Sequence, residues 1–527
     1  MEDLPQHEIV RRLSRRFQVA LVLEGLLVGL VAGGVITLYR LVLSNAERLL
    51  RLVTGAAAGS PLLMAAWFAV LAVLLACVSA LVTWEPATSG SGIPQIDAEV
   101  VDRMDAPWRR VIPAKFAEGA MLALAGLSLG REGPSVQLGG MSGKAVSRAL
   151  RRRRGEERLL VTCGAAAGMS AAFHAPLTGV LFALEEIHKE FTAPLIISVM
   201  CSSVASDYLV SQALGVAPVM SVALGGDLPH ASYGLVVLLG LVAGLLGALH
   251  NRGMFACQGL FGRLPARAPL ARLAVPFALA GVMAFAWPEL LCGGDAIIEL
   301  LESPEGLGAA AIAALLLGKY LYTTVCFGSG APGGTLLPLV VMGALVGGLF
   351  ARGMGALGMP GEYVPNFVAL GVAGLFSGVV RAPVTAVVLV FELTGSLDAL
   401  LSASVVSVVA YVTANLTETE PFYEHLLAAL LGSQEKAAGA PAGPAAGGKS
   451  LQTVLVGAGS RLEGMLVRDV PWPDGMRVVT IERAGGDVVP SGGTRIEALD
   501  RLLVIVDASA TDDALLKLRL MSSQRVR

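Results

Sequence analysis

Apolar runs separated by glycine and proline constrain this chain more than any other feature of its sequence. The first two runs, Phe17–Leu52 and Pro61–Trp84, are both longer than the ~20 apolar residues that a membrane-spanning helix needs. Hydrophobic residues make up 54% of the 527 residues and charged residues only 15%, whereas a soluble domain has about 25% charged residues. The sequence therefore predicts an all-α polytopic membrane protein.

Several later runs, such as Pro176–Leu184 and Leu336–Phe350, are too short to span a membrane alone. Glycine-rich breaks precede two of the helix-like segments, at residues 89–94 and 328–334. Broken helices are tolerated in a membrane where their backbone lines a cavity, and the half-helices of transporters point their ends at ions. We therefore predict half-helices arranged around an ion pathway.

The motif Gly130-Arg131-Glu132-Gly133-Pro134 joins the apolar run Val111–Leu129 to a second run that ends at Leu150. Pro134 suits the first turn of a helix, the glycines allow close backbone approach, and a helix N-terminus attracts anions. An ionisable group inside a membrane costs about 2.5–3.5 kcal/mol and marks a functional position. Glu132 is therefore a candidate functional residue. The alternative is an exposed turn with an ordinary charged pair.

The second half of the chain repeats part of the first. The matched positions are Pro134, Val136, Gly139 and Gly143 with Pro338, Val340, Gly343 and Gly347, then Ala175–Val180 with Ala382–Val387, and Glu185 with Glu392. Glu186 has no counterpart, because Leu393 stands at its place. Matches in the same order predict a duplicated architecture with inverted halves.

Charge and cysteine content narrow the function classes further. The net charge of −2 indicates no nucleic-acid partner. The arginines at positions 11, 12, 15 and 16 place the N-terminus in the cytoplasm by the positive-inside rule. The six cysteines have no metal-binding spacing, so we expect small buried hydrophobic side chains, and neither a metal site nor a cofactor.

The composition changes after Leu431. Ala437–Gly448 contains mostly alanine, glycine and proline and is typical of a linker. Beyond it, strand-like runs at residues 454–456, 478–481 and 502–506 and a short helix over Ala514–Leu520 predict a small α+β domain. The expected domains are an N-terminal segment at 1–16, a transmembrane domain at 17–432, a linker at 433–449 and a C-terminal domain at 450–527.

Four segments together resemble the CLC family of chloride channels and chloride–proton exchangers. They are Gly90-Ser91-Gly92-Ile93-Pro94, the motif around Glu132, the break Gly333–Pro338, and Pro421-Phe422-Tyr423. The resemblance covers roughly residues 17–432. It implies a CLC-type inverted-repeat fold, a homodimer with one pathway in each subunit, and chloride and protons as the transported ions.

The resemblance also implies roles for individual residues. Chloride would be bound by the hydroxyls of Ser91 and Tyr423 and by the backbone amides of Thr335 and Leu336. The neighbours of Glu132, Arg131 and Gly133, are included among the chloride-binding residues. Leu336 replaces the phenylalanine usual in the family, so the packing that narrows the pore is expected to differ.

Two glutamates would carry the coupling. Glu132 matches the gating glutamate of the family, which competes with chloride when deprotonated. Glu186 matches the inner proton acceptor of exchangers, where channels commonly have valine. The alternative for Glu186 is a carboxylate at a helix end that meets cytoplasmic water.

The sequence leaves three functions open. The first is chloride–proton exchange in a bacterial cytoplasmic membrane, with both termini cytoplasmic and lipid around the protein. The second is a passive voltage- or pH-gated chloride channel on the same fold. The third, an intramembrane enzyme that uses Glu132 or Ser329 with His174, lacks a supporting motif. The anion preference and the stoichiometry also stay open.

Other charged residues, and the C-terminal region, have secondary roles. Lys115 matches a buried family lysine with an electrostatic or structural role, and Arg381 and Glu392 are expected to be structural charges. Residues 450–527 resemble the TrkA-C domain of channel and transporter regulators. That resemblance implies either a small-molecule regulator bound there or a dimer contact, and the alternative is a generic small β-rich domain.

Overall fold

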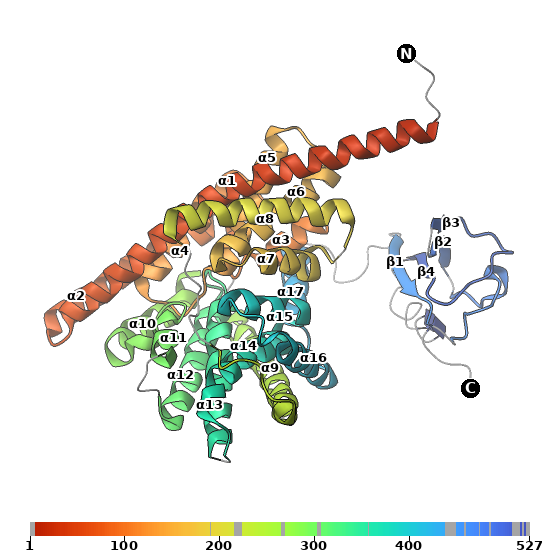
Figure 1. Cartoon of the computed structure of the whole chain (residues 1–527). Coiled ribbons are helices and arrows are strands. Elements are labelled where there is room, and N and C mark those ends of the chain that lie inside the picture. Colours follow the sequence, from red (N-terminus) through yellow and green to blue (C-terminus); the bar gives the residue numbers. More distant parts are fainter. Residues whose placement is uncertain are drawn as a thin grey trace. The chain divides into compact units, whose positions relative to one another are not determined.

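The computed structural model describes residues 6–189, 191–215, 224–264, 269–302, 307–356, 358–437, 449–457, 460–473, 475–483, 486–507, 517–518 and 521–522. The chain divides into two compact units, Met1–Leu430 and Leu431–Arg527 (Figure 1). The described part of the first unit is built from helices, and the second unit contains a sheet.

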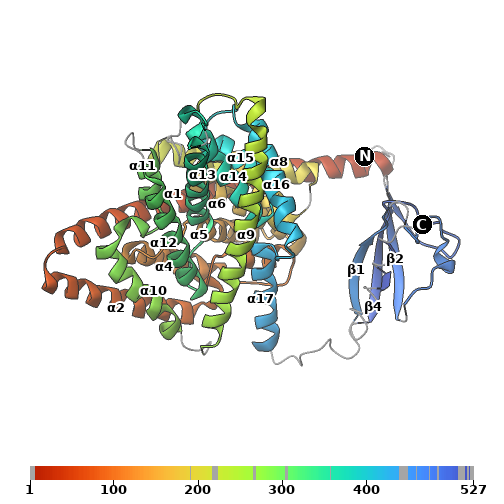
Figure 2. The ribbon, with the colours of Figure 1, turned by 90° about the horizontal axis from the view of Figure 1, so that it is seen from below.

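Eight helices of the described residues are long and apolar enough to cross a membrane. They are α1 (Gln6–Ala57), α2 (Pro61–Trp84), α8 (Ala193–Leu214), α9 (Tyr233–Gly262), α10 (Pro269–Ala286), α12 (Ala309–Gly328), α13 (Leu336–Gly355) and α14 (Val364–Val380). In Figures 1 and 2, α1 runs beside α8 and α2 beside α10. The predicted polytopic membrane class is confirmed, and this is an integral membrane protein.

The remaining helices are shorter or less apolar. They are α3 (Ile93–Val100), α4 (Trp108–Ala125), α5 (Glu132–Ala149), α6 (Arg154–Phe173), α7 (Pro176–Phe182), α11 (Asp295–Glu302), α15 (Pro383–Thr394), α16 (Leu400–Leu416) and α17 (Phe422–Ala437). Short helices such as α3, α7 and α15 are present as predicted. The prediction that the run from Leu336 is too short to span a membrane was wrong, because its helix continues past Phe350 to Gly355 and is 20 residues long.

Two helix predictions were wrong in detail. Helix α1 begins at Gln6 instead of Phe17, because the charged residues before Phe17 are good helix formers and continue the same helix. The segment from Pro176 is not one α-helix, because α7 changes at Ala183 to a π-helical turn, η2 (Ala183–His188). Such turns often occur at functional sites. The left-handed Lys189 (φ 58°) ends the segment.

The two halves repeat each other, as predicted. Helices α5, α6, α7 and α8 pack among themselves as α13, α14, α15 and α16 do, and α7 packs on α15 between the halves. Glycines let the helix backbones touch, because a Cβ at Gly139 would collide with the Gly164 carbonyl and one at Gly371 with the Gly343 carbonyl. The repeated glycines are therefore contact points between helices.

Glu185 and Glu392 connect the halves reciprocally. The Glu185 carboxylate accepts hydrogen bonds from the N–H of Thr385 (2.8 Å) and from its hydroxyl (2.6 Å). The Glu392 carboxylate accepts the same two bonds from Thr178, at 2.7 and 2.6 Å. Each acid thus caps the first turn of the short helix in the opposite half, which gives Glu392 the structural role expected for it.

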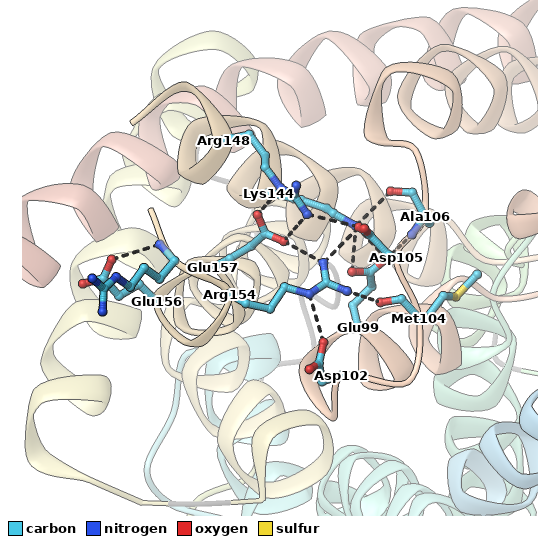
Figure 3. A network of polar contacts seen from close by, with 11 residues as sticks. Glu99, Asp102, Met104, Asp105, Ala106, Lys144, Arg148, Arg154, Glu156 and Glu157 are labelled. Atoms are coloured by element: carbon cyan, nitrogen blue, oxygen red, sulfur yellow. Dashed lines mark hydrogen bonds and ion pairs between the residues drawn. The ribbon is translucent and has the colours of Figure 1, made fainter. Parts of the chain in front are cut away.

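A polar network ties α3, α5 and α6 together (Figure 3). The buried Lys144 of α5 donates to both carboxylate oxygens of the buried Glu99 at the end of α3 (2.9 and 2.8 Å) and pairs with Asp105 (2.6 Å). Arg154, at the start of α6, pairs with Asp105 (3.0 Å). Burial alone would raise the pKa of Asp105, but the hydrogen bonds from Lys144 and Arg154 lower it to about 2.

This network lies at the ends of α3 and α5 that are away from the predicted ion site. Ser91 comes just before α3 and Glu132 is the first residue of α5. Fixing the far ends of both helices therefore fixes the separation of Ser91 and Glu132.

The cysteines only partly match the expectation. All six are free thiols, and Cys163 and Cys326 are buried, but Cys77 is exposed on α2. A small apolar side chain on the outer surface of a membrane helix contacts lipid at little cost, so burial was too strong a prediction for Cys77.

The second unit contains an antiparallel sheet with strand order β1-β4-β2-β3. The strands are β1 (Lys449–Leu455), β2 (Met476–Arg483), β3 (Gly486–Val488) and β4 (Arg501–Asp507). Their core includes Val454, Ile481, Leu502 and Val504. The predicted run at 454–456 overlaps the end of β1, and the runs at 478–481 and 502–506 lie within β2 and β4. Of the predicted helix, Lys517 and Leu518 are helical, and the rest lies outside the described residues.

Candidate ion pathway

The glycine-rich breaks predicted from the sequence meet in the middle of the first unit. Gly130 and Gly334 exchange two backbone hydrogen bonds, at 2.7 and 2.8 Å. The Gly90 N–H donates to the Gly330 carbonyl at 3.1 Å. Because α3, α5 and α13 all begin at these breaks, their N-terminal ends are brought together by backbone pairing.

Gly133 keeps two of these ends in contact. A Cβ at position 133 would lie 2.5 Å from Ser91 Oγ and 2.6 Å from the Ser91 carbonyl oxygen, closer than real Cβ atoms come to other atoms. Gly92 has a φ of 98°, a conformation that favours glycine. Both glycines are therefore required for Ser91 to lie against the start of α5.

Glu132 is fully buried at the first position of α5. Its Oε2 accepts a hydrogen bond from the backbone N–H of Leu337 at 3.2 Å, whereas its Oε1 has no hydrogen-bond partner among the described residues. Leu337 lies in the first turn of α13, where helix N–H groups attract negative charge. The carboxylate thus occupies an anion-binding position.

Two buried hydroxyls lie in the same region without partners. Ser91 Oγ and Tyr423 Oη have no hydrogen bond of ordinary geometry to a described residue, although their side chains are only 2% and 1% exposed. The side chain of Thr335 lies close to the Tyr423 hydroxyl, and Phe182 packs edge-on against the Tyr423 ring at 6.0 Å. Buried donors left unpaired cost about 1–3 kcal/mol each, so a bound anion would stabilise this arrangement.

Of the backbone donors predicted for chloride, Thr335 is the N-cap of α13 and Leu336 its first residue, and both are buried. Arg131 is the N-cap of α5. Its guanidinium faces Asp295, with Nη2 3.9 Å from the carboxylate. The structure thus brings Ser91, Glu132, Gly133 and the start of α13 together, whereas the Arg131 side chain pairs elsewhere.

Glu186 lies in η2 and is 6% exposed. Its Oε1 has no hydrogen-bond partner among the described residues. The charged groups that act on it are Lys189, Glu424, Asp97 and Glu185. The first two form an ion pair of 3.0 Å between the end of η2 and α17.

The two glutamates have different surroundings. Arg131 and Asp295 are among the charged groups with the largest effect on Glu132, whereas those with the largest effect on Glu186 are Lys189, Glu424, Asp97 and Glu185. Tyr423 is close enough for both carboxylates to act on its hydroxyl. Tyr423 therefore lies within electrostatic reach of both carboxylates.

The residues offered for an enzyme do not assemble a catalytic site. The Ser329 hydroxyl donates to the Cys326 carbonyl at 2.7 Å, and His174 Nδ1 lies 3.4 Å from Asp207. Within the described ranges, no hydrogen bond joins Ser329 to His174. Those ranges also contain no group of three His, Cys, Asp or Glu residues that could hold a metal ion.

Residues 73–415 match the voltage gated chloride channel family. The chain belongs to this family. Residues 451–518 match the TrkA-C domain, so both resemblances found in the sequence are confirmed.

Curated relatives of this CLC protein include two bacterial proteins named H(+)/Cl(−) exchange transporter ClcA. The Yersinia pestis bv. Antiqua (strain Angola) protein is 33% identical over 365 residues, 67% of this chain and 75% of the relative. The Citrobacter koseri protein is 31% identical over 445 residues, 82% of this chain and 93% of the relative.

Solved structures agree in fold. The crystal structure of a slow cyanobacterial Cl−/H+ antiporter has a TM-score of 0.74 and 28% identity, and the match covers 79% of this chain and 99% of that one. A CLC-type fluoride/proton antiporter, 21% identical with a TM-score of 0.64, shares the fold.

Leu337 and Asp295 belong to the site but were not predicted from the sequence. Leu337 stands in the same run as Thr335 and Leu336, directly before Pro338, so its N–H could have been included. Asp295 belongs to a segment that nothing in the sequence linked to Arg131.

Proposed function

We propose that this protein exchanges chloride for protons across a bacterial cytoplasmic membrane. The observation that carries the proposal is the Glu132 carboxylate on the N–H of Leu337, a titratable acid at a helix N-terminus inside the protein. The names of the curated relatives support the same activity.

The central anion site uses neutral donors. The hydroxyls of Ser91 and Tyr423 and the amides of Thr335 and Leu336 would bind chloride, with Gly133 allowing Ser91 its close approach. Neutral donors hold an anion without the strong attraction of a full positive charge, so the ion can leave again. Arg131 contributes positive potential from the side of Asp295.

Glu132 couples the two ions by competition. A carboxylate and a chloride about 4 Å apart repel by roughly 4 kcal/mol at an effective dielectric of about 20. Protonation of Glu132 removes that repulsion and frees the Leu337 N–H, so chloride can take the position. Loss of the proton returns the carboxylate and displaces the anion.

Glu186 delivers the proton from the other side. Its carboxyl is buried, and it is near Tyr423, which also feels Glu132. A passive channel needs no buried acid here, so Glu186 favours exchange over the channel alternative. Chloride and protons are the only ions in this cycle, which uses no cofactor and no enzymatic step.

The experiment measures chloride and proton fluxes in proteoliposomes. Glu132→Gln should keep chloride movement and lose proton coupling, and Glu186→Val should stop proton movement while chloride still flows. Glu185→Gln, the neighbouring acid with a structural contact, is the matched control and should keep coupling. Coupled proton transport that persists in Glu132→Gln would contradict the proposal.

A homodimer would also explain the surface around α7 and α15. Leu177 and Val384 are 39% and 55% exposed, next to the partly exposed carboxylates of Glu392 and Glu185. Carboxylates facing lipid are costly, whereas a second copy would cover them. Cysteines introduced at Val384 should crosslink two subunits, and a monomer in native mass spectrometry would contradict the dimer.

The TrkA-C unit would sense a regulator from the cytoplasm, where both termini would lie. The chain enters this unit from α17, the helix that carries Tyr423 and Glu424. A conformational change in the unit could therefore act on the pathway through α17. Truncation after Gly432 should leave a folded transporter that has lost its regulation by the TrkA-C unit.

A further inference from the structure

Two cavities lie on the Arg131 side of the site, and Glu47 of α1 borders both. The smaller, of about 30 Å³, is lined by Gly130, Arg131 and Leu337 among others. The larger, of about 370 Å³, is lined by Arg51, Glu289 and Asp295 among others. Glu47 and Cys292 line both cavities, so the two cavities are adjacent.

The smaller cavity reaches the residue that holds Glu132. Leu337, whose N–H binds the Glu132 carboxylate, is part of its wall, and so are Gly130 and Pro134 on both sides of Glu132 in sequence. A volume of 30 Å³ exceeds the ~10–15 Å³ that one water needs. Water in this cavity would lie between Glu47 and the residues that flank Glu132 in the chain.

The charged groups around Glu47 suit a proton acceptor. Asp295, Arg131, Arg51 and Lys319, from four different elements, all act on it. Arg131 also has the largest effect of any charged group on Glu132, so it attracts both the Glu132 and the Glu47 carboxylates. Within the described residues Glu47 makes no hydrogen bond, which leaves both of its oxygens available.

The charged groups with the largest effect on Glu186 are a different set, Lys189, Glu424, Asp97 and Glu185. Glu47 therefore serves a different side of Glu132 from the one that Glu186 serves. We propose that Glu47 is the outer proton relay of the exchange cycle, an inference that rests on the proposed function.

In this step the O–H bond of protonated Glu132 breaks, and the Glu47 carboxylate gains the proton through a water chain. Glu132 becomes a carboxylate and rebinds the Leu337 N–H. Glu47 then releases the proton to water in the larger cavity and is a carboxylate again. The reverse sequence loads Glu132 from the same side.

The test compares Glu47→Gln with Glu47→Asp and Glu289→Gln in proteoliposomes. Positioned acid–base groups contribute ~10²–10⁴-fold, and water can replace part of this, so Glu47→Gln should slow exchange by about tenfold or more. Chloride and proton fluxes should fall together at an unchanged ratio. Glu47→Asp should restore most of the rate, and Glu289→Gln, at a carboxylate that lines only the larger cavity, should stay near wild type.

A second background separates proton relay from a structural or electrostatic effect. In Glu132→Gln, chloride moves without protons, so adding Glu47→Gln should leave the chloride flux unchanged. A wild-type exchange rate in Glu47→Gln, or an equal slowing of chloride in the Glu132→Gln background, would overturn the relay. Proton coupling retained in Glu132→Gln itself would instead overturn the proposed function.

Discussion

Lys115 and Lys319 make the same contact in the two halves of the protein. Lys115 Nζ donates to the carbonyls of Thr88 and Gly90, both at 2.7 Å. Lys319 Nζ donates to the carbonyls of Leu290 and Cys292, at 3.0 and 2.8 Å. Each buried ammonium therefore fixes a loop by its backbone, but only the loop held by Lys115 leads to Ser91.

This difference makes a matched pair of variants. Lys115→Met leaves two carbonyls unpaired beside Ser91, so chloride affinity should fall, and Tyr423→Phe gives the reference loss of one chloride donor. Lys319→Met should cost similar stability, about 1–3 kcal/mol for each group left unpaired, with chloride affinity preserved. Calorimetric titration and thermal unfolding measure the two quantities. Equal loss of chloride affinity in both lysine variants would contradict the assignment.

Glu185 and Glu392 give a second matched pair. Because each caps the opposite half through the same two groups of a threonine, Glu185→Gln and Glu392→Gln should destabilise the transporter by similar amounts. Hydrogen bonds to charged groups contribute about 1.5–3 kcal/mol each, and the amide oxygen keeps part of this. Thermal unfolding in detergent provides the measurement. A large effect from only one of the two variants would show that the caps are not equivalent.

The sequence predicted this architecture from features that depend on local chemistry. Glycine and proline breaks mark helix ends because these residues alter the allowed backbone conformations. The internal repeat aligned Glu185 with Glu392 as equivalent positions in the two halves. The sequence could not show that each acid reaches across to the other half, since that depends on the packing of α7 on α15.

The candidate site was predicted less completely than the fold. Ser91, Glu132 and the start of α13 all lie at or near the first residue of a helix, and such positions can be predicted from the glycines and prolines in the sequence. The pairing of Arg131 with Asp295, and the position of Glu47 beside both cavities, arise where α1, α5 and α11 meet. The hydrophobic periodicity of one helix does not predict which other helices it contacts. The change to a π-helical turn at Ala183 was missed for the same reason, because its residues differ little from those of an α-helix.

The C-terminal unit should depend on pH through Asp500. Burial alone would raise the pKa of Asp500, but hydrogen bonds from Arg483 (2.8 Å) and from the Glu497 N–H (2.8 Å) lower it below its ordinary value. Because the folded pKa is lowered, this contribution is complete above the unfolded value of about 3.9 and is lost as the pH falls through the folded value.

Hydrogen exchange of the backbone amides of β2 and β4 in the full-length protein measures the stability of this unit. Asp500→Asn should weaken protection at pH 7 by about 2 kcal/mol, as for a charged hydrogen bond, and remove the loss that wild type shows at acid pH. Glu497→Gln is the control, because an exposed ion pair contributes about 0–1 kcal/mol. Protection that is unchanged in Asp500→Asn would refute this role.

The central claim, that Glu132 and Glu186 couple chloride to protons, is tested most directly by uphill proton movement. Purified protein in liposomes is given a chloride gradient with no pH gradient, and the internal pH is followed with the membrane potential clamped. Our account predicts that chloride flow drives protons in the opposite direction, against the pH gradient that builds up. Chloride flux with no proton movement in the wild-type protein would contradict it and identify a channel.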